Sequence, residues 1–161
     1  MRKAKSDLTL CGVGSAVFGI WLFLKNILYL LFAGSYLSRV FAFDEGDLLQ
    51  EKAAIVLWLA ASFLAMLLHI LIGRQAIREA KGKEGKRRFY LVLAGALLIF
   101  NAAEVAADIA AAPGAADYLD LFCDMMLEAA RAINFAALLL AARKLRVLRR
   151  EERMEAAGHA D

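Results

Sequence analysis

Apolar positions follow one another along this chain in four long runs, and the charged residues gather in short stretches between them. About 20 apolar residues cross the hydrocarbon of a bilayer as an α-helix, and lipid accepts apolar surface that a soluble fold cannot cover. The pattern therefore predicts an all-α polytopic membrane protein built as a four transmembrane helix bundle. The expected helices cover approximately 8–33, 52–73, 89–112 and 116–142, within a single transmembrane domain over 1–161 that ends in a charged tail, 143–161.

The first apolar run is longer than one bilayer thickness, because it extends from Leu8 to Phe43. Two interpretations fit it. Either it forms one long tilted helix, or the helix ends near Leu31 and residues 35–43 lie along the outer interface. Aromatic residues in its second half suit an interfacial belt in both cases.

The positions of the basic residues predict the orientation. They cluster in three segments: Arg2, Lys3 and Lys5; Arg74, Arg78, Lys81, Lys83, Lys86, Arg87 and Arg88; and Arg143, Lys144, Arg146, Arg149 and Arg150. The first loop on the opposite side holds two basic residues among four acids, and the third loop holds no basic residue. Because cytoplasmic loops carry the excess of Lys and Arg, we expect a multi-pass protein of the cell membrane with both termini cytoplasmic (N-in/C-in).

Composition excludes several classes of protein. The chain is 61% hydrophobic with one proline, and its net charge of +3 comes from residues beside the apolar runs, where they meet lipid headgroups. No nucleic-acid partner is expected, since no recognition motif accompanies the charge. Cys11 and Cys123 stand alone and are expected near opposite faces, so neither a redox pair nor a disulfide is predicted.

Polar residues interrupt the last two apolar runs at helical spacing. The third expected helix carries Asn101, Glu104 and Asp108, and the fourth carries Asp117, Asp120, Asp124, Glu128, Arg131 and Asn134. Steps of three and four place each set on one face of its helix. A charge in the hydrocarbon costs about 2.5–3.5 kcal/mol, so these faces should turn inward toward each other.

Depth along the helices predicts which charges meet. A rise of about 1.5 Å per residue places Glu104 and Asp124 at a similar depth, roughly 9–12 Å below the outer surface. Lys25 on the first helix reaches the same depth and is a candidate counter-ion. Arg131 follows Glu128 by one turn and can pair with it.

The depth and helix face of each polar residue predict its role in the candidate site. Substrate or cation binding is assigned to Asn101, Glu104, Asp108, Asp124 and Glu128, charge compensation and tuning to Lys25, Arg131 and Asn134, and an outer mouth to Asp117 and Asp120. Carboxylate and amide oxygens suit hard or organic cations, and a carboxylate at the bilayer centre also suits protons. No catalytic residue and no resident cofactor other than a bound cation is expected, and the identity of any metal is left open.

Two interpretations of the acidic face remain. In one, the basic residues and asparagines neutralise the acids, and the cluster only determines how the helices dock. In the other, six acids against two fixed cations leave a surplus of negative charge, which a bound cation, a proton or entering water would relieve.

Three hypotheses of function follow. The first is a small transporter or channel-like protein that admits a cation, or a proton-coupled solute, from the outer side; a homo-oligomer would give it more room than four helices enclose. The second is a non-catalytic membrane subunit or sensor that binds a partner through the basic loop and tail. The third is a small membrane enzyme that acts on a lipid.

One short motif bears on the enzyme hypothesis. Residues 101–108, with Asn101, Glu104 and Asp108, resemble the Asn-Glu-Asp helix motif of bacterial diacylglycerol kinase, whose activity would imply magnesium-ATP as co-substrate. The likeness covers eight residues, and its Asn and Glu are three apart where that family has four. It also lies toward the expected outer face, where ATP is absent. No nucleophile–His–acid set, HExxH motif or P-loop occurs in the chain.

Overall fold

The computed structural model describes residues 1–32, 48–83, 89–110 and 118–158, and these residues form four α-helices. They are α1 (Arg2–Phe32), α3 (Leu48–Ala80), α4 (Phe89–Ala110) and α5 (Tyr118–Gly158). Each is long and apolar enough to cross a membrane. The prediction of an all-helical chain with four such helices is confirmed.

The helices extend beyond their apolar parts. Thus α1 already begins at Arg2, α3 covers Leu48–Ala80, and α5 continues without a break from the apolar segment through the charged tail to Gly158. Ala, Leu, Arg, Lys and Glu are strong helix formers, so a helix that leaves the apolar layer can continue through such a sequence. The described part of the first helix ends at Phe32. Residues 35–43 lie outside the described part of the chain, so both interpretations of the first apolar run stay open.

The end of α3 is a Schellman cap. Gly82 adopts a positive φ of 80°, its N–H donates to the Glu79 carbonyl oxygen at 3.0 Å, and the Lys83 N–H donates to the Arg78 carbonyl oxygen at 3.0 Å. Glycine accepts this left-handed conformation without the strain that a side chain would cause. The cap ends the helix just after the buried Ala80.

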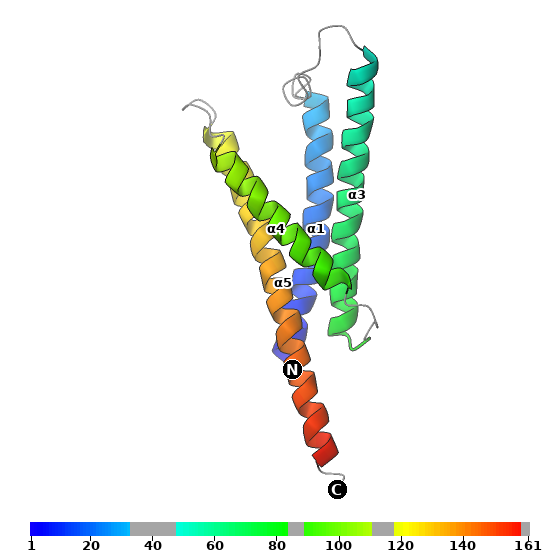
Figure 1. Ribbon diagram of the computed structural model, residues 1–161, viewed down its shortest axis with the longest axis vertical. Helices are drawn as coiled ribbons and strands as arrows, with labels where there is room; N and C mark the ends of the chain where they lie inside the picture. Colours follow the sequence, from blue (N-terminus) through cyan, green and yellow to red (C-terminus); the bar gives the residue numbers. More distant parts are fainter. Residues whose placement is uncertain (33–47, 84–88, 111–117, 159–161) are drawn as a thin grey trace.

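The helices form two pairs (Figure 1). One pair is α1 with α3, the other is α4 with α5, and α5 also contacts α1. The pairs meet near the start of α1, which we call the terminal end, and diverge toward the opposite end, which we call the open end. The last turns of α5 extend alone beyond the other helices at the terminal end.

Glycines bring α1 and α3 into backbone contact. A Cβ atom added to Gly12 would lie 2.8 Å from the Gly73 carbonyl oxygen, and one added to Gly73 would collide with the Gly12 carbonyl oxygen. Small residues permit this approach between apolar helices. Two side-chain hydrogen bonds join the same helices, from Ser15 Oγ to the His69 carbonyl oxygen (3.1 Å) and from Asn26 Nδ2 to Ser62 Oγ (2.7 Å).

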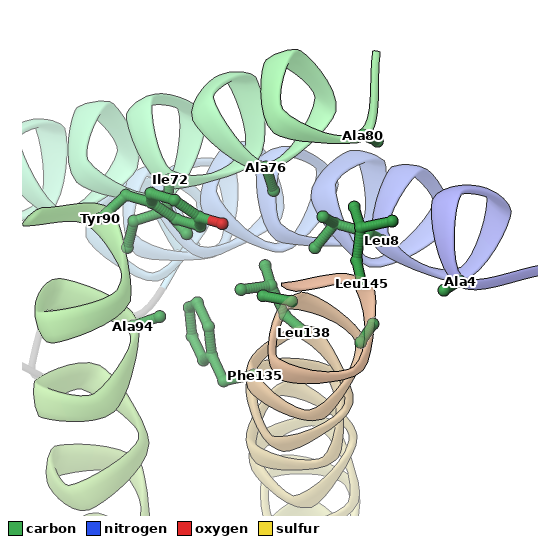
Figure 2. Packing of buried hydrophobic residues seen from close by; sticks show 12 residues of the cluster. Ala4, Leu8, Ile72, Ala76, Ala80, Tyr90, Ala94, Phe135, Leu138 and Leu145 are labelled. Atoms are coloured by element: carbon green, nitrogen blue, oxygen red, sulfur yellow. The ribbon is translucent and has the colours of Figure 1, made fainter. Parts of the chain in front are cut away.

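An apolar core closes the terminal end, and Figure 2 shows its packing. All four described helices contribute to it: Ala4 and Leu8 from α1; Ile72, Ala76 and Ala80 from α3; Tyr90 and Ala94 from α4; and Phe135, Leu138, Ala141, Ala142 and Leu145 from α5. Phe135, Leu8 and Leu138 are fully buried. The apolar core therefore lies at the terminal end, whereas the charged pair of Lys25 and Asp124 lies where the pairs diverge.

Candidate functional site

Five charged side chains within the apolar spans come together where the helix pairs diverge. We call them the interhelical charged site: Lys25 of α1, Glu104 of α4, and Asp124, Glu128 and Arg131 of α5. Helical spacing of 3.6 residues per turn gives α5 a single face on which its three members stand one above another. The site thus joins three of the described helices.

The member nearest the open end is the pair of Lys25 and Asp124. Lys25 Nζ lies 2.5 Å from Asp124 Oδ1, and the Tyr29 hydroxyl donates a hydrogen bond of 3.3 Å to Oδ2. The Lys25 ammonium also stands 5.2 Å from the centre of the Tyr29 ring, in range of a cation–π interaction. Charge-assisted hydrogen bonds of this kind are about twice as strong as neutral ones, so this pair is a firm link between α1 and α5.

Arg131 forms ion pairs with two carboxylates. Its Nη2 donates to Glu104 Oε2 at 2.9 Å and lies 3.8 Å from Glu128 Oε1. Its side chain is only 8% exposed. One guanidinium group therefore holds α4 against α5 and also compensates a neighbour on its own helix.

The charges of the interhelical charged site do not balance. Three carboxylates, Glu104, Asp124 and Glu128, face two fixed cations, Lys25 and Arg131. With all five ionised, these described side chains carry a formal charge of −1. A net charge in an apolar surrounding costs free energy unless further groups offset it.

A small cavity borders the site. Its volume is ≈ 30 Å³, and Lys25, Glu128 and Arg131 line it together with the apolar side chains of Phe18, Trp21 and Leu127. A cavity of about 10–15 Å³ on this measure already holds one water molecule. This cavity therefore has room for one or two water molecules.

Buried nitrogen atoms lie around and below Arg131. Arg131 Nε, Asn101 Nδ2 and His69 Nε2 have no hydrogen-bond partner within the described residues, although Asn101 and His69 are each only 2% exposed. His69 Nδ1 lies 2.8 Å from the Ala65 carbonyl oxygen, and its ring packs against Phe135 at 5.3 Å between centroids. Buried polar groups without a protein partner are commonly satisfied by water, so this level of the bundle is polar enough to hold it.

The remaining residues assigned from the sequence are placed as follows. Asn134 donates through Nδ2 to the Cys11 carbonyl oxygen at 3.2 Å, which ties α5 to α1. Asp117 lies outside the described residues, and so do the side chains of Asp108 and Asp120. Their assignment to binding and to an outer mouth stays a prediction. No three His, Cys, Asp or Glu side chains of the described segments gather in a way that could hold a metal ion.

Sequence reasoning missed a second charged cluster, at the terminal end. Arg146 donates to both oxygens of Glu79, from Nε at 2.8 Å and from Nη2 at 3.0 Å, and the Tyr90 hydroxyl donates to Oε2. Arg149 Nη2 donates to the Glu79 main-chain carbonyl oxygen at 2.6 Å. We call Glu79, Tyr90, Arg146 and Arg149 the Glu79 clamp; it joins α3, α4 and α5.

A signal for the Glu79 clamp was present in the sequence. Glu79 stands three residues after Ala76 and seven after Ile72, which places it on the buried face of α3. Its neighbours in sequence are mostly basic, so the segment resembled a solvated loop. The helical register, rather than the local composition, would have identified it.

These features define a helical protein with four apolar helices and a charged site between them. The chain matches no protein-family model, and the comparisons found no curated protein and no solved structure similar to it.

Proposed function

We propose that this chain is a multi-pass integral membrane protein with its terminal end on the cytoplasmic side. Its apolar surface supports this: side chains such as Val56, Leu57, Ile99 and Leu140 are more than 60% exposed, on three different helices. Lipid covers such surface, whereas water does not. The start of α1, the end of α3 and the tail of α5 lie at the same end and carry most of the basic residues, as the positive-inside rule requires.

Within that membrane, the chain acts as a small transporter or channel-like protein that admits a cation, or a proton-coupled solute, from the outer side. The observation that carries this proposal is the cluster of three carboxylates and two bases in the interhelical charged site, beside a cavity in the apolar spans. Charged side chains at such depth commonly mark ion or proton pathways.

The residues of the site take separate roles in this proposal. Asp124, toward the open end, meets the incoming cation, and Lys25 holds that carboxylate in place. Glu104 and Glu128 bind the cation deeper in the span, where Arg131 limits the net charge to be compensated. Below them the apolar core of the terminal end closes the bundle.

The test is flux into liposomes that contain the purified full-length protein. Proton, sodium, potassium and organic-cation uptake would be measured for the wild type, Glu104→Gln and Glu128→Gln. We expect uptake of one of these cations, reduced at least tenfold in both variants, because each substitution removes the negative charge that attracts the cation. Glu155→Gln, in the exposed tail, is the matched control and should leave uptake unchanged. Equal uptake by all four proteins and by empty liposomes would refute the proposal.

A second candidate function is recognition of a cytoplasmic partner. The specific observation is that the charged part of α5 exposes the side chains of Arg143, Lys144 and Arg150, and that its last turns extend beyond the other helices. A non-catalytic subunit or sensor would use this surface, together with the basic loop, to bind an acidic protein. A stoichiometric partner that co-purifies with the wild type but not with Arg143→Gln/Lys144→Gln/Arg150→Gln, in a protein without cation flux, would favour this function over transport.

A further inference from the structure

The exposed face of α5 carries an apolar stripe that repeats every seven residues. Met126, Ile133, Leu140, Val147 and Met154 follow one another at this spacing, and their exposed fractions range from 50% to 68%. Seven residues make almost two full turns of an α-helix, so these five side chains lie along one side of α5. We call them the α5 seam. The described helices of the chain leave the seam uncovered.

We infer that the α5 seam is the contact surface for the α5 helix of a second copy of this chain. The inference rests on the membrane placement within the proposed function, but not on transport. Three features support it: the course of the seam past the apolar span, the contrast with the buried face of the same helix, and the side chains beside the seam.

The seam continues beyond the layer that lipid can cover. Arg143 and Lys144 follow soon after Leu140 and mark the level of the lipid headgroups. At about 1.5 Å per residue, Met154 lies about 21 Å beyond Leu140, close to the end of α5 at Gly158. The last turns of α5 extend beyond the other helices (Figure 1). Lipid covers the seam within the span but does not reach Met154, whereas a helix that runs beside α5 covers both parts.

The buried face of α5 changes at the same boundary. Arg131, Leu138 and Leu145 also repeat every seven residues and are buried, and the next residue in this register is the exposed Glu152. The seam lies two residues, or about 200°, from this register, on the opposite side of the helix. Beyond the bundle, the buried register therefore becomes charged, whereas the exposed register stays apolar up to Met154. A charged residue suits water, and an exposed apolar stripe suits a second protein surface.

The period of the seam and its small neighbours fit a parallel copy of α5. A strict seven-residue repeat keeps two helices in contact when they wind around each other as a left-handed coiled coil. Within the span, the large residues of the seam alternate with partly buried pairs of alanines, Ala129–Ala130 and Ala136–Ala137, which let two backbones approach closely. Both copies have the same orientation in the membrane, so a two-fold axis along the membrane normal places each seam residue opposite its own copy.

Charged side chains beside the seam also fit a second copy. Arg150 and Glu151 are exposed and lie between Val147 and Met154 along the helix. In a parallel pair, Arg150 of one copy can pair with Glu151 of the other, and the two-fold axis makes this contact twice. Arg143 and Lys144 are both cationic, but they lie at the level of the headgroups, where long basic side chains reach lipid phosphates.

Disulfide cross-linking tests the seam in the full-length protein whose two native cysteines are replaced by serine. Single cysteines would replace Leu140, Val147 or Met154, and the proteins would be oxidised in phosphatidylcholine–phosphatidylglycerol vesicles at high lipid excess. Glu152→Cys is the control, because Glu152 is exposed in the same tail but on the opposite side of α5. We expect at least about fivefold more cross-linked dimer from each seam cysteine, since residues of a coiled-coil seam meet their own copies. Equal cross-linking of all four proteins would overturn the inference.

Charge substitutions give a second measurement. Val147→Lys/Met154→Lys places like charges opposite each other in the seam, and Glu152→Lys is its control, because it changes the net charge by the same amount. All three positions are exposed and lysine is a strong helix former, so both variants retain the fold. Sedimentation in detergent should show a dimer for the wild type and Glu152→Lys. The dimer dissociation constant should be at least about tenfold higher for the double variant.

The outcomes separate this inference from the proposed function. A monomeric wild type, or a purified monomer whose seam cysteines cross-link to a different polypeptide in intact cells, would overturn the second copy as the occupant of the seam. A dimer without any cation uptake would support the seam and refute transport. Cation uptake by a monomer would support transport and overturn the seam.

Discussion

Single residues in this protein stabilise contacts between helices by charge. Counting depth along the sequence placed Lys25 and Asp124 at the same level, and the structure joins them at 2.5 Å. The same counting placed Glu104 there but could not show that Arg131 bonds to it, because that contact depends on how far α4 and α5 rotate about their own axes. Asn134 illustrates the limit: spacing put it on the acidic face, yet its amide bonds to α1.

Removal of Lys25 should cost more than removal of the whole pair. Lys25→Met leaves the partly buried Asp124 carboxylate with its charge uncompensated, and we expect a loss of about 1–3 kcal/mol in the free energy of unfolding. The double variant Lys25→Met/Asp124→Leu should be more stable than Lys25→Met, since an apolar pair needs no compensation. Thermal unfolding in detergent measures both, with exposed Lys52→Met as the control. Equal stability of the single and double variants would contradict the role of this pair.

Two kinds of contact position the helices of this molecule: close backbone packing and hydrogen-bonded ion pairs. The contact of α1 with α3 depends on glycines, whereas the Glu79 clamp fixes α5 against α3 and α4. The apolar runs predicted the existence of all four helices well, because hydrophobicity over 20 residues is a strong signal. The described helices extend beyond these runs, and the runs give no bound for the extensions, since polar helix formers lack the apolar pattern by which a helix is recognised.

Gly73→Ala should destabilise the contact between α1 and α3. The new methyl group would collide with the Gly12 carbonyl oxygen, which belongs to the backbone and cannot move alone. We expect a loss of roughly 1–3 kcal/mol, the usual cost of an overpacked interface. Gly95→Ala is a suitable control, because an added Cβ there meets nothing within 4 Å; it should be neutral or stabilise α4 by up to about 1 kcal/mol. Denaturation of both variants in the same detergent compares them directly, and equal effects would contradict this packing.

Arg146→Ala should release the tail of α5 from α3. The substitution removes two hydrogen bonds to the Glu79 carboxylate and leaves that buried group with less compensation. Hydrogen bonds to charged groups each contribute about 1.5–3 kcal/mol to stability. Their loss lowers the local stability, so we expect faster amide exchange in the last turns of α3 and in residues 142–150 of α5. Exposed Arg150→Ala should change neither segment. Unchanged exchange in Arg146→Ala would show that the apolar core alone holds the tail.

At the scale of the whole molecule, two helix pairs meet at one end and diverge at the other. The sequence predicted alternating helix directions from the basic segments, and the described helix ends that carry those residues do lie together. It could not predict the divergence, because that depends on side chains from different helices packing at one level, such as Phe135 against His69. Hydrophobicity identifies a span but contains little information about its neighbours.

The proposed orientation predicts which positions a membrane-impermeant maleimide can reach in intact cells. With Cys11 and Cys123 replaced by serine, a cysteine introduced at Gly46 should react from outside. Cysteines at Lys83 and Ala156 should react only after the membrane is permeabilised, because both positions lie on the side with the basic residues. Reaction of Ala156→Cys in intact cells would place the tail outside and reverse the topology.

The unbroken length of α5 has a mechanical consequence. One continuous helix connects Asp124, which pairs with Lys25 of α1, to Gly158, the last residue of α5. Between these two residues, Arg146 binds Glu79 in the Glu79 clamp. At about 1.5 Å per residue, the arm from the clamp to Asp124 measures about 33 Å and the arm to Gly158 about 18 Å. If α5 tilts as one rigid helix about the Glu79 clamp, the tip of the tail moves in the direction opposite to Asp124, through roughly half the displacement.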